Sequence, residues 1–228
     1  MALILSIETS SPVCSVCLSR NGKMIGLRED HSGLNHASLL TVFIQELFSE
    51  ANLNIKQLDA VTVSAGPGSY TGLRIGVATA KGICYSISKP LIAVDSLQIL
   101  AKSMQANFND ERLWYCPVID ARRNEIYFSL LDSKDVVLIP SRNMEVSALT
   151  PFEIAPNVKI IIGGSGANKC LKLWDSSNLI LDSAAIFSAQ HMMAISEEKF
   201  MNSQFENVAR FEPSYIKPVF ISTVKRSS

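Results

Sequence analysis

The sequence lacks an excess of charge of either sign, because 21 lysines and arginines balance 21 aspartates and glutamates. Tight binding of nucleic acid by an isolated domain depends on clustered Lys and Arg, so this composition argues against a chain that holds RNA or DNA alone. A weak contact with tRNA that a partner supports stays open. The one notable basic cluster, Lys217, Lys225 and Arg226, lies near the end of the sequence.

Long hydrophobic runs are also missing. The apolar run from Ala2 to Ile7 has no basic leader and is followed at once by Glu8, so it does not resemble a signal peptide. No stretch approaches the roughly 20 apolar residues that are needed to span a bilayer. We therefore expect a cytoplasmic protein that does not enter the membrane.

Motifs for metal or redox chemistry are scarce. The five cysteines are odd in number and scattered, which is typical of reduced thiols rather than of a disulfide framework. Cys14 and Cys17 form a CxxC, but an offset of three places them on opposite faces of a strand, and no second pair completes a metal set. The three histidines, His31, His36 and His191, lack the i, i+4 spacing of a helical metal site. We predict buried thiols and no metal site.

What the sequence does contain is a weak internal repeat, seen when residues 7–25 are placed over residues 119–137 without a gap. Ile7-Glu8-Thr9-Ser10 then matches Ile119-Asp120-Ala121-Arg122. Each copy predicts an apolar strand that ends in a carboxylate, a tight turn, a second strand, a hairpin turn and a third strand. The two hairpin turns are Arg20-Asn21-Gly22 and Asp132-Ser133-Lys134.

The remaining segments alternate between helical and strand patterns. Apolar residues at helical spacing follow Asn35, which we predict to be the N-cap of the first helix. The predicted strands then cover residues 60–65, 91–94 and 158–162; the predicted helices cover 71–87, 96–106, 167–174 and 183–199, and an extended tail covers 212–221.

Two β-β-β-α-β-α halves, each with an acid at the end of its first strand, resemble the α/β fold of actin, hexokinase and Hsp70, the actin-like (ASKHA, ribonuclease H-like) fold. In that fold the two acids face each other across a cleft and hold the metal of a nucleotide. We expect Glu8 and Asp120 to face each other here, with an N-terminal lobe of residues 1–108 and a C-terminal lobe of residues 109–228. The fold by itself does not fix the function.

The sharpest local motif is the run Gly66-Pro67-Gly68-Ser69-Tyr70-Thr71-Gly72-Leu73-Arg74-Ile75-Gly76. A Gly-rich turn that opens a helix presents free N–H groups to an anion, although this run is no P-loop because no Gly-Lys-Ser/Thr follows. A tight turn with a Ser or Thr cap explains the same pattern. Within the helix, Gly72, Gly76 and Ala80 recur every four residues. This bare stripe predicts that another helix approaches closely.

The candidate nucleotide cleft is incomplete. An actin-like ATPase needs small, Gly-rich backbone after its second acid, but Arg122 and Arg123 follow Asp120 here. We expect one of these arginines to lie near the cleft, or to pair with the acids, and to prevent tight ATP binding by the isolated chain. The residues assigned to this vestigial cleft are Glu8, Thr9, Ser10, Gly66, Gly68, Ser69, Asp120, Gly163 and Gly164.

Taken together, several motifs resemble the TsaB (YeaZ) family. The resemblance implies a non-catalytic scaffold that dimerises with the catalytic subunit TsaD through its N-terminal lobe and works with the ATPase TsaE. The complex would transfer threonylcarbamoyl to the tRNA adenosine beside the anticodon. ATP and Mg²⁺ would belong to the complex, and tRNA would be reached only through it. The motifs are Ile7–Ser10, Asn35–Leu40, Gly66–Gly76, Ile119–Tyr127 and Glu212–Ile216.

The resemblance also implies where TsaD binds. The related heterodimer is a contact between helices of the N-terminal lobes, and the same patch predicts a homodimer when the partner is absent. The metal-binding His-x-x-x-His of TsaD is missing here, so no catalytic or metal residue is assigned. The residues assigned to the interface are His36, Leu39, Leu40, Phe43, Leu47, Tyr70, Gly72, Arg74, Gly76 and Ala80.

Two other functions stay open on the sequence alone. One is a small actin-like ATPase or kinase-like transferase that uses Glu8, Asp120 and the Gly66 loop, against which the two arginines after Asp120 argue. The other is a glycoprotease-type peptidase, for which the spacing identifies no Ser-His-Asp or Cys-His set.

Overall fold

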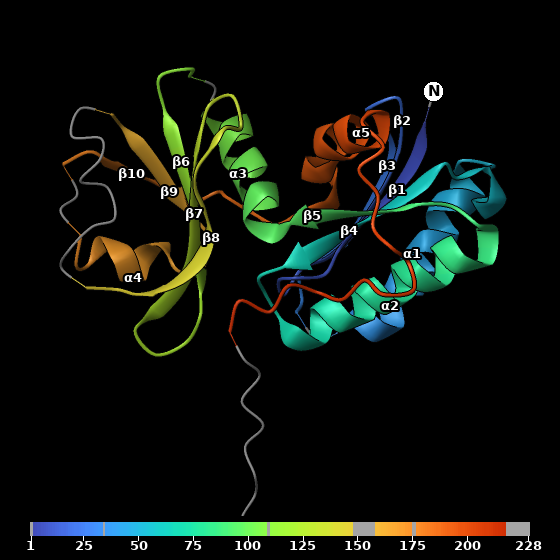
Figure 1. The fold of residues 1–228 in the computed structure, drawn as a ribbon, viewed down its shortest axis with the longest axis horizontal. Helices are drawn as coiled ribbons and strands as arrows, with labels where there is room; N and C mark the ends of the chain where they lie inside the picture. The colour runs from blue at the N-terminus through green and yellow to red at the C-terminus, as the bar shows by residue number, and fades with distance from the viewer. Residues whose placement is uncertain (1, 34, 109, 148–157, 175–176, 218–228) are drawn as a thin grey trace, which may run out of the picture.

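The computed structural model describes residues 2–33, 35–108, 110–147, 158–174 and 177–217. Two five-stranded sheets lie side by side (Figure 1), and the first has the strand order β3-β2-β1-β4-β5. Strand β1 is antiparallel to β2 and parallel to β4, so the sheet is mixed. The bounds are Leu3–Glu8 for β1, Cys14–Arg20 for β2, Lys23–Asp30 for β3, Ala60–Gly66 for β4 and Leu91–Asp95 for β5.

The second sheet repeats the topology of the first, with the strand order β8-β7-β6-β9-β10 when read from the matching edge. Glu8 is the last residue of β1 and Asp120 is the last residue of β6, as the internal repeat predicts. The predicted α/β actin-like fold is therefore confirmed. The bounds are Trp114–Asp120 for β6, Glu125–Asp132 for β7, Val137–Glu145 for β8, Ile160–Gly163 for β9 and Leu179–Asp182 for β10.

Helices cover both faces of the first sheet. Helices α1 and α2 lie on one face and α5 on the other, while α3 lies between the two sheets and packs on β6 (Figure 1). None of the helices in the described ranges has the length and apolar character that crossing a membrane requires. The bounds are His36–Glu50 for α1, Ile55–Gln57 for η1, Tyr70–Ile87 for α2, Ser96–Asn107 for α3, Ala167–Leu171 for α4, Ala189–Met192 for η2 and Met193–Met201 for α5.

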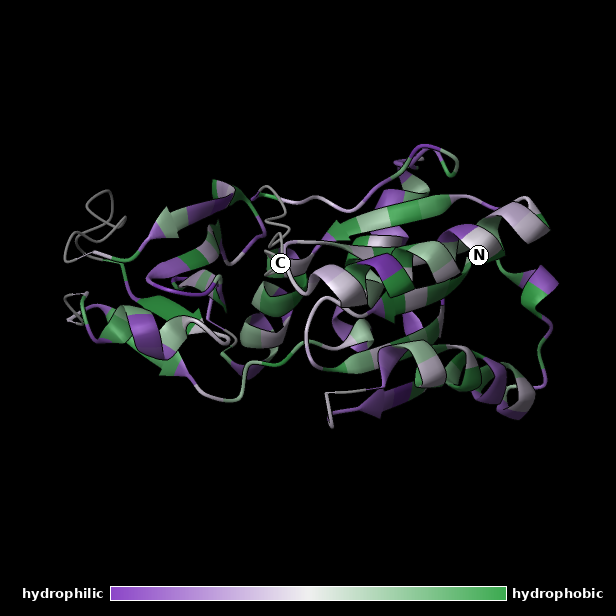
Figure 2. Ribbon diagram, turned by 90° about the horizontal axis from the view of Figure 1, so that it is seen from below, coloured by the Kyte–Doolittle hydropathy of each residue, from purple (hydrophilic) through white to green (hydrophobic). Residues whose placement is uncertain are grey.

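The core has layers on both sides of the first sheet, because β1 is a central strand whose residues are all buried. Leu5 and Ile7 face the layer that contains α1 and α2. Ile4 faces the layer that contains α3 and η2, and by the alternation of a strand Glu8 lies on that same face. In Figure 2, seen from the side of α1 and α2, these helices alternate between hydrophobic and hydrophilic residues, as expected for helices with one face on the core.

Local predictions agree with the structure at several points. Asn21 and Gly22 adopt positive φ angles of 53° and 68°, as an Asn-Gly hairpin turn requires. Cys14 and Cys17 are free and lie in the two opposite core layers. Burial raises the pKa of the Cys14 thiol to about 11 and that of Cys17 to about 12, so both are inert hydrophobic side chains.

Two predicted helix bounds and one predicted cap need correction. The last helix begins at Ala189 and Met193 rather than near residue 183, because a turn precedes it and Ser188 caps η2 through Gln190 N. Helix α4 ends at Leu171 rather than near residue 174. Asn35 does occupy the N-cap position of α1, but its side chain makes no capping hydrogen bond. Residues 218–221 of the predicted tail lie outside the described residues.

Candidate functional site

The turn after β1 encloses the first predicted acid. Glu8 is fully buried, and Ser10 donates to its Oε1 from both N and Oγ at 2.6 Å. The second oxygen, Oε2, is buried without a hydrogen-bond partner among the described residues. Burial raises the pKa of Glu8 to about 7, and the hydrogen bonds from Ser10 oppose this rise only in part. Glu8 is therefore folded back into the protein rather than directed toward a ligand.

The Gly66 loop is packed against this turn. Ser69 N donates to Ser10 O at 2.6 Å, and a Cβ on Gly68 would lie 2.2 Å from the same oxygen. Gly66 has a φ of +102°, and a Cβ there would lie 2.6 Å from Ser214 O. The glycines are thus required by the close approach of the chain's own backbone.

Several N–H groups of the Gly66 loop are directed to protein acceptors. Gly66 N donates to Ser96 Oγ at 3.2 Å, and Gly72 N donates to Ser69 Oγ at 3.3 Å. The second bond makes Ser69 the N-cap of α2, as one of the two sequence interpretations predicted. The loop therefore offers an anion far fewer free donors than its composition suggested.

The bare stripe of α2 faces inward, which corrects the prediction that it receives a partner helix. A Cβ on Gly72 would lie 2.0 Å from Thr9 O, and one on Gly76 would lie 2.2 Å from Thr9 Oγ1. Thr9 Oγ1 also donates to Gly72 O at 2.8 Å. Ala80 is fully buried in the same core layer. The element that needs this close approach is the turn after β1.

The second predicted acid is half-exposed and already paired. Asp120 Oδ1 accepts from Lys169 Nζ and from Arg122 N, each at 2.7 Å, and Asp120 N donates to Ser165 Oγ at 3.0 Å. Burial alone would raise the pKa of Asp120, but the hydrogen bonds and the charge of Lys169 outweigh it, so the pKa lies below its usual value. Asp120 is thus held as a carboxylate.

The Gly163-Gly164 turn supports the end of β6. Gly164 has a φ of +100°, and a Cβ there would lie 2.4 Å from Val118 O. A Cβ on Gly163 would lie 2.8 Å from Ala185 Cβ. Gly164 is therefore packed against the main chain of β6 two residues before Asp120, and Gly163 is packed against the residue-185 segment.

The candidate cleft residues thus form two clusters, one in each half. Glu8 is enclosed by its own turn, and no hydrogen bond or ion pair among the described residues joins it to Asp120. Of the two alternatives for the arginines, pairing with the acids is not found among the described residues, because Lys169 is the cation on Asp120 and both guanidinium groups are exposed. Sequence reasoning missed Lys169, although it lies three residues after Gly166, within reach of the β6 end.

The predicted interface residues divide into buried and exposed groups. Leu40 and Leu47 belong to the core with the α2 stripe and are not on the surface, which corrects their assignment. His36 Nε2 lies 3.0 Å from Ser11 O and holds the turn after β1. Leu39 and Phe43 are half-buried against the same core layer.

Tyr70 and Arg74 are exposed, but the tail of the chain lies beside them. The rings of Tyr70 and Tyr215 are 5.2 Å apart, the Arg74 guanidinium lies 4.3 Å from the centre of the Tyr70 ring, and Arg74 Nε donates to Tyr215 Oη at 3.3 Å. Further along α2, Lys81 Nζ donates to Phe211 O at 2.8 Å. The tail therefore follows α2, as Figure 1 shows.

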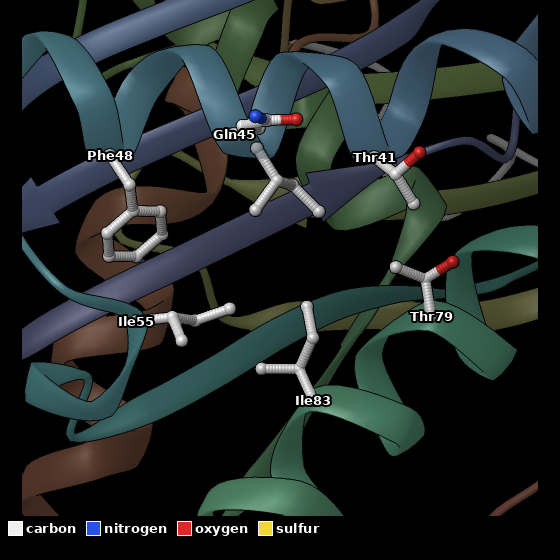
Figure 3. Close-up of a pocket in the computed structure, with 7 residues that line it drawn as sticks. Thr41, Gln45, Phe48, Ile55, Thr79 and Ile83 are labelled. Carbon is white, nitrogen blue, oxygen red and sulfur yellow. The ribbon is translucent and has the colours of Figure 1, made fainter.

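An apolar groove of about 380 Å³ opens between α1 and α2. Side chains from both helices point into it, together with one from η1 (Figure 3). The sequence had placed apolar residues on α1 without indicating this opening, because the groove depends on the separation of the two helices. Its lining residues are Thr41, Ile44, Gln45, Phe48, Ile55, Thr79 and Ile83.

Comparisons with known proteins agree on one group. The family model described as "TsaD: tRNA N6-adenosine threonylcarbamoyltransferase" matches residues 29–151, more than half of the chain. The tRNA threonylcarbamoyladenosine biosynthesis protein TsaB of Haemophilus influenzae is 32% identical over 126 residues, 55% of this chain and 52% of that protein. The match thus spans about half the length of that relative.

Two further similarities extend over nearly the whole chain. The protein of the same name from Escherichia coli is 24% identical over 221 residues, 94% of each chain. The solved structure of YeaZ from Pseudomonas aeruginosa superimposes with a TM-score of 0.82 at 21% identity and covers 94% of this chain and 100% of its own. The structural likeness supports the fold.

Proposed function

The chain belongs to the family of the tRNA N6-adenosine threonylcarbamoyltransferase TsaD, within its TsaB (YeaZ) group, and on that premise we propose that it serves the biosynthesis of threonylcarbamoyladenosine in tRNA. We propose a non-catalytic scaffold that binds TsaD through its N-terminal lobe. The ATPase TsaE completes the complex, which brings in ATP, Mg²⁺ and tRNA.

The main support for a scaffold role is that the first half of the candidate cleft is closed. An actin-like enzyme holds a metal and phosphates at this position. Here Glu8 is buried under its own turn, and Ser69 N of the Gly66 loop donates a hydrogen bond to Ser10 O. In the second half, Lys169 neutralises Asp120. A nucleotide bound here would have to break these contacts, so the arrangement supports a subunit without its own phosphoryl chemistry.

We expect the isolated chain to bind ATP and Mg²⁺ more weakly than micromolar. The reason is that several backbone donors of the Gly66 loop already have protein acceptors, Glu8 is buried, and Asp120 is paired with Lys169. Isothermal calorimetry with ATP and Mg²⁺ measures this directly. Micromolar affinity, or steady hydrolysis of ATP by the purified chain, would favour the ATPase alternative instead.

The groove between α1 and α2 is the surface that we propose for TsaD. It is apolar at its base, where Ile44 and Phe48 are buried, and it is bordered by the small polar residues Thr41 and Thr79. A helix of a partner lobe that fills the groove would bury apolar surface without leaving a charge unpaired. A specific complex of this kind buries on the order of 1,200–2,000 Å² in total.

The double variant Thr41→Arg/Thr79→Arg is expected to abolish binding of TsaD, because it places two charges at the edge of an apolar contact. The fold should persist, since Thr41 is exposed and Thr79 half-exposed. Co-purification with TsaD and the tRNA modification level are the measurements. Ala80, by contrast, is a poor test site because it is fully buried inside the chain.

Glu111→Arg is the matched control, since it also changes the charge by two units at an exposed position, in the loop between α3 and β6. It should leave the complex intact. Normal co-purification of the groove variant with TsaD would show that the interface lies elsewhere. Light scattering of the isolated protein tests the homodimer on the same surface, which the groove variant should convert to a monomer.

A further inference from the structure

The turn between β6 and β7 presents two arginines to solvent. Arg122 and Arg123 are both exposed, and neither guanidinium has a hydrogen-bond or ion-pair partner in the described ranges of the chain. The acid beside them does not neutralise them, because Asp120 is paired with Lys169. The turn therefore carries two uncompensated positive charges in a protein whose formal net charge is zero.

Arginine is an unusual choice for the backbone of this turn. Arg122 and Arg123 have φ angles of 68° and 50°, in the left-handed region that favours Gly and Asn. The same chain uses Asn21 and Gly22 for a pair of consecutive left-handed residues in the β2–β3 hairpin. Two arginines at such positions are disfavoured for the turn itself, which points to a role for their side chains.

Lys169 stabilises this conformation of the turn through three hydrogen bonds. Its Nζ donates to Asp120 Oδ1 and Arg123 O at 2.7 Å and to Glu125 O at 3.2 Å, so all three of its N–H groups are used within the turn. Arg122 N donates to Asp120 Oδ1 as well. The main chain between Asp120 and Glu125 is thus fixed, so the side chains of Arg122 and Arg123 project from a preorganised backbone.

We infer that Arg122 and Arg123 contact phosphate groups of the RNA backbone when the chain works in its tRNA-modifying complex, an inference that rests on the proposed function. The exposed turn between β6 and β7 suits the extended sugar-phosphate backbone of an RNA better than it suits a free nucleotide. A nucleotide needs N–H groups that wrap its phosphates, whereas the N–H groups of Ala121, Arg122 and Glu125 all donate within the turn. Two neighbouring guanidinium groups suit adjacent phosphates.

The test is the double variant Arg122→Asn/Arg123→Gly, which restores the residues that a left-handed turn favours. Its melting temperature should rise, while the affinity of the complex of this chain with TsaD and TsaE for an unmodified tRNA transcript should fall roughly tenfold at low salt. The slope of log K against log salt should decrease by about 1.4–1.8, because each phosphate contact contributes about 0.7–0.9. A purely structural role would not give opposite signs for stability and binding.

Arg20→Gln/Lys23→Gln is the matched control, since it removes two exposed charges at a hairpin of the first sheet. It should leave the affinity and the salt slope unchanged. Unchanged tRNA binding in the Asn-Gly variant overturns the inference. Micromolar binding of ATP by the isolated wild-type chain that the Asn-Gly variant loses also overturns it, because it would assign the arginines to a free nucleotide.

Failure of the proposed function has a different signature, namely a wild-type chain that does not co-purify with TsaD. In that case the same tRNA transcript is titrated with the full chain alone at low salt. Weaker binding by the Asn-Gly variant than by the Arg20/Lys23 control supports the arginine contact, and equal binding overturns it.

Discussion

Replacing Gly72 with alanine is expected to lower the free energy of unfolding by about 3 kcal/mol or more, at the upper end of the range for overpacked cores. The added Cβ would lie 2.0 Å from Thr9 O, a backbone atom that cannot rotate away. Helix α2 cannot retreat easily, because Leu73 and Val77 are packed in the core on either side of this contact. Urea denaturation followed by circular dichroism measures the loss.

Gly82→Ala provides the control on the same helix. Gly82 is exposed, and a Cβ there would meet no atom within 4 Å, so the variant should gain about 0.5–1 kcal/mol from helix propensity alone. Opposite signs for two identical substitutions would confirm that the bare stripe is needed for packing on the β1 turn. A Gly72→Ala protein as stable as the wild type would contradict this account of the stripe.

Glu8→Gln is expected to remove a pH-dependent loss of stability of about 3 kcal/mol. Burial raises the pKa of Glu8 from 4.5 to about 7 in the folded protein. Between these values the folded state holds a proton that the unfolded state has released, so the contribution of Glu8 to stability falls as the pH rises from about 4.5 to about 7. Above about pH 7 the folded protein carries the full cost of a buried carboxylate.

The measurement is the free energy of unfolding of both proteins at pH 5 and pH 8. The variant should be more stable than the wild type at pH 8 and should lose most of that advantage at pH 5, because glutamine cannot ionise. Asp120→Asn is the comparison, since the pKa of Asp120 is lowered from 3.8 and its stabilisation is lost only at pH values below 3.8, so the difference between the Asp120 and Asn proteins should be nearly the same at pH 5 and pH 8. An equal difference between Glu8 and Gln proteins at both pH values would disprove a raised pKa at Glu8.

The features that the sequence determined by itself are local or repeated. Six consecutive apolar or buried residues make β1 a central strand, Asn21-Gly22 specifies the β2–β3 turn, and a Ser or Thr after Gly68 is available to cap α2, which Ser69 does. Each depends on residues only a few positions apart, where propensity and hydrogen bonding within one turn dominate. The internal repeat extended this local information to the matching topology of the two sheets.

The features that only the tertiary structure decided depend on distant contacts. Periodicity reveals that Gly72, Gly76 and Ala80 form a stripe on α2. It does not reveal whether the stripe faces the chain's own core or a partner, and the contact with Thr9 decides that it faces the core. Lys169 reaches Asp120 across 49 residues of sequence. Whether an acid at a strand end meets solvent, a lysine or its own buried turn is set by the packing of whole elements, and no pattern within a single segment encodes that.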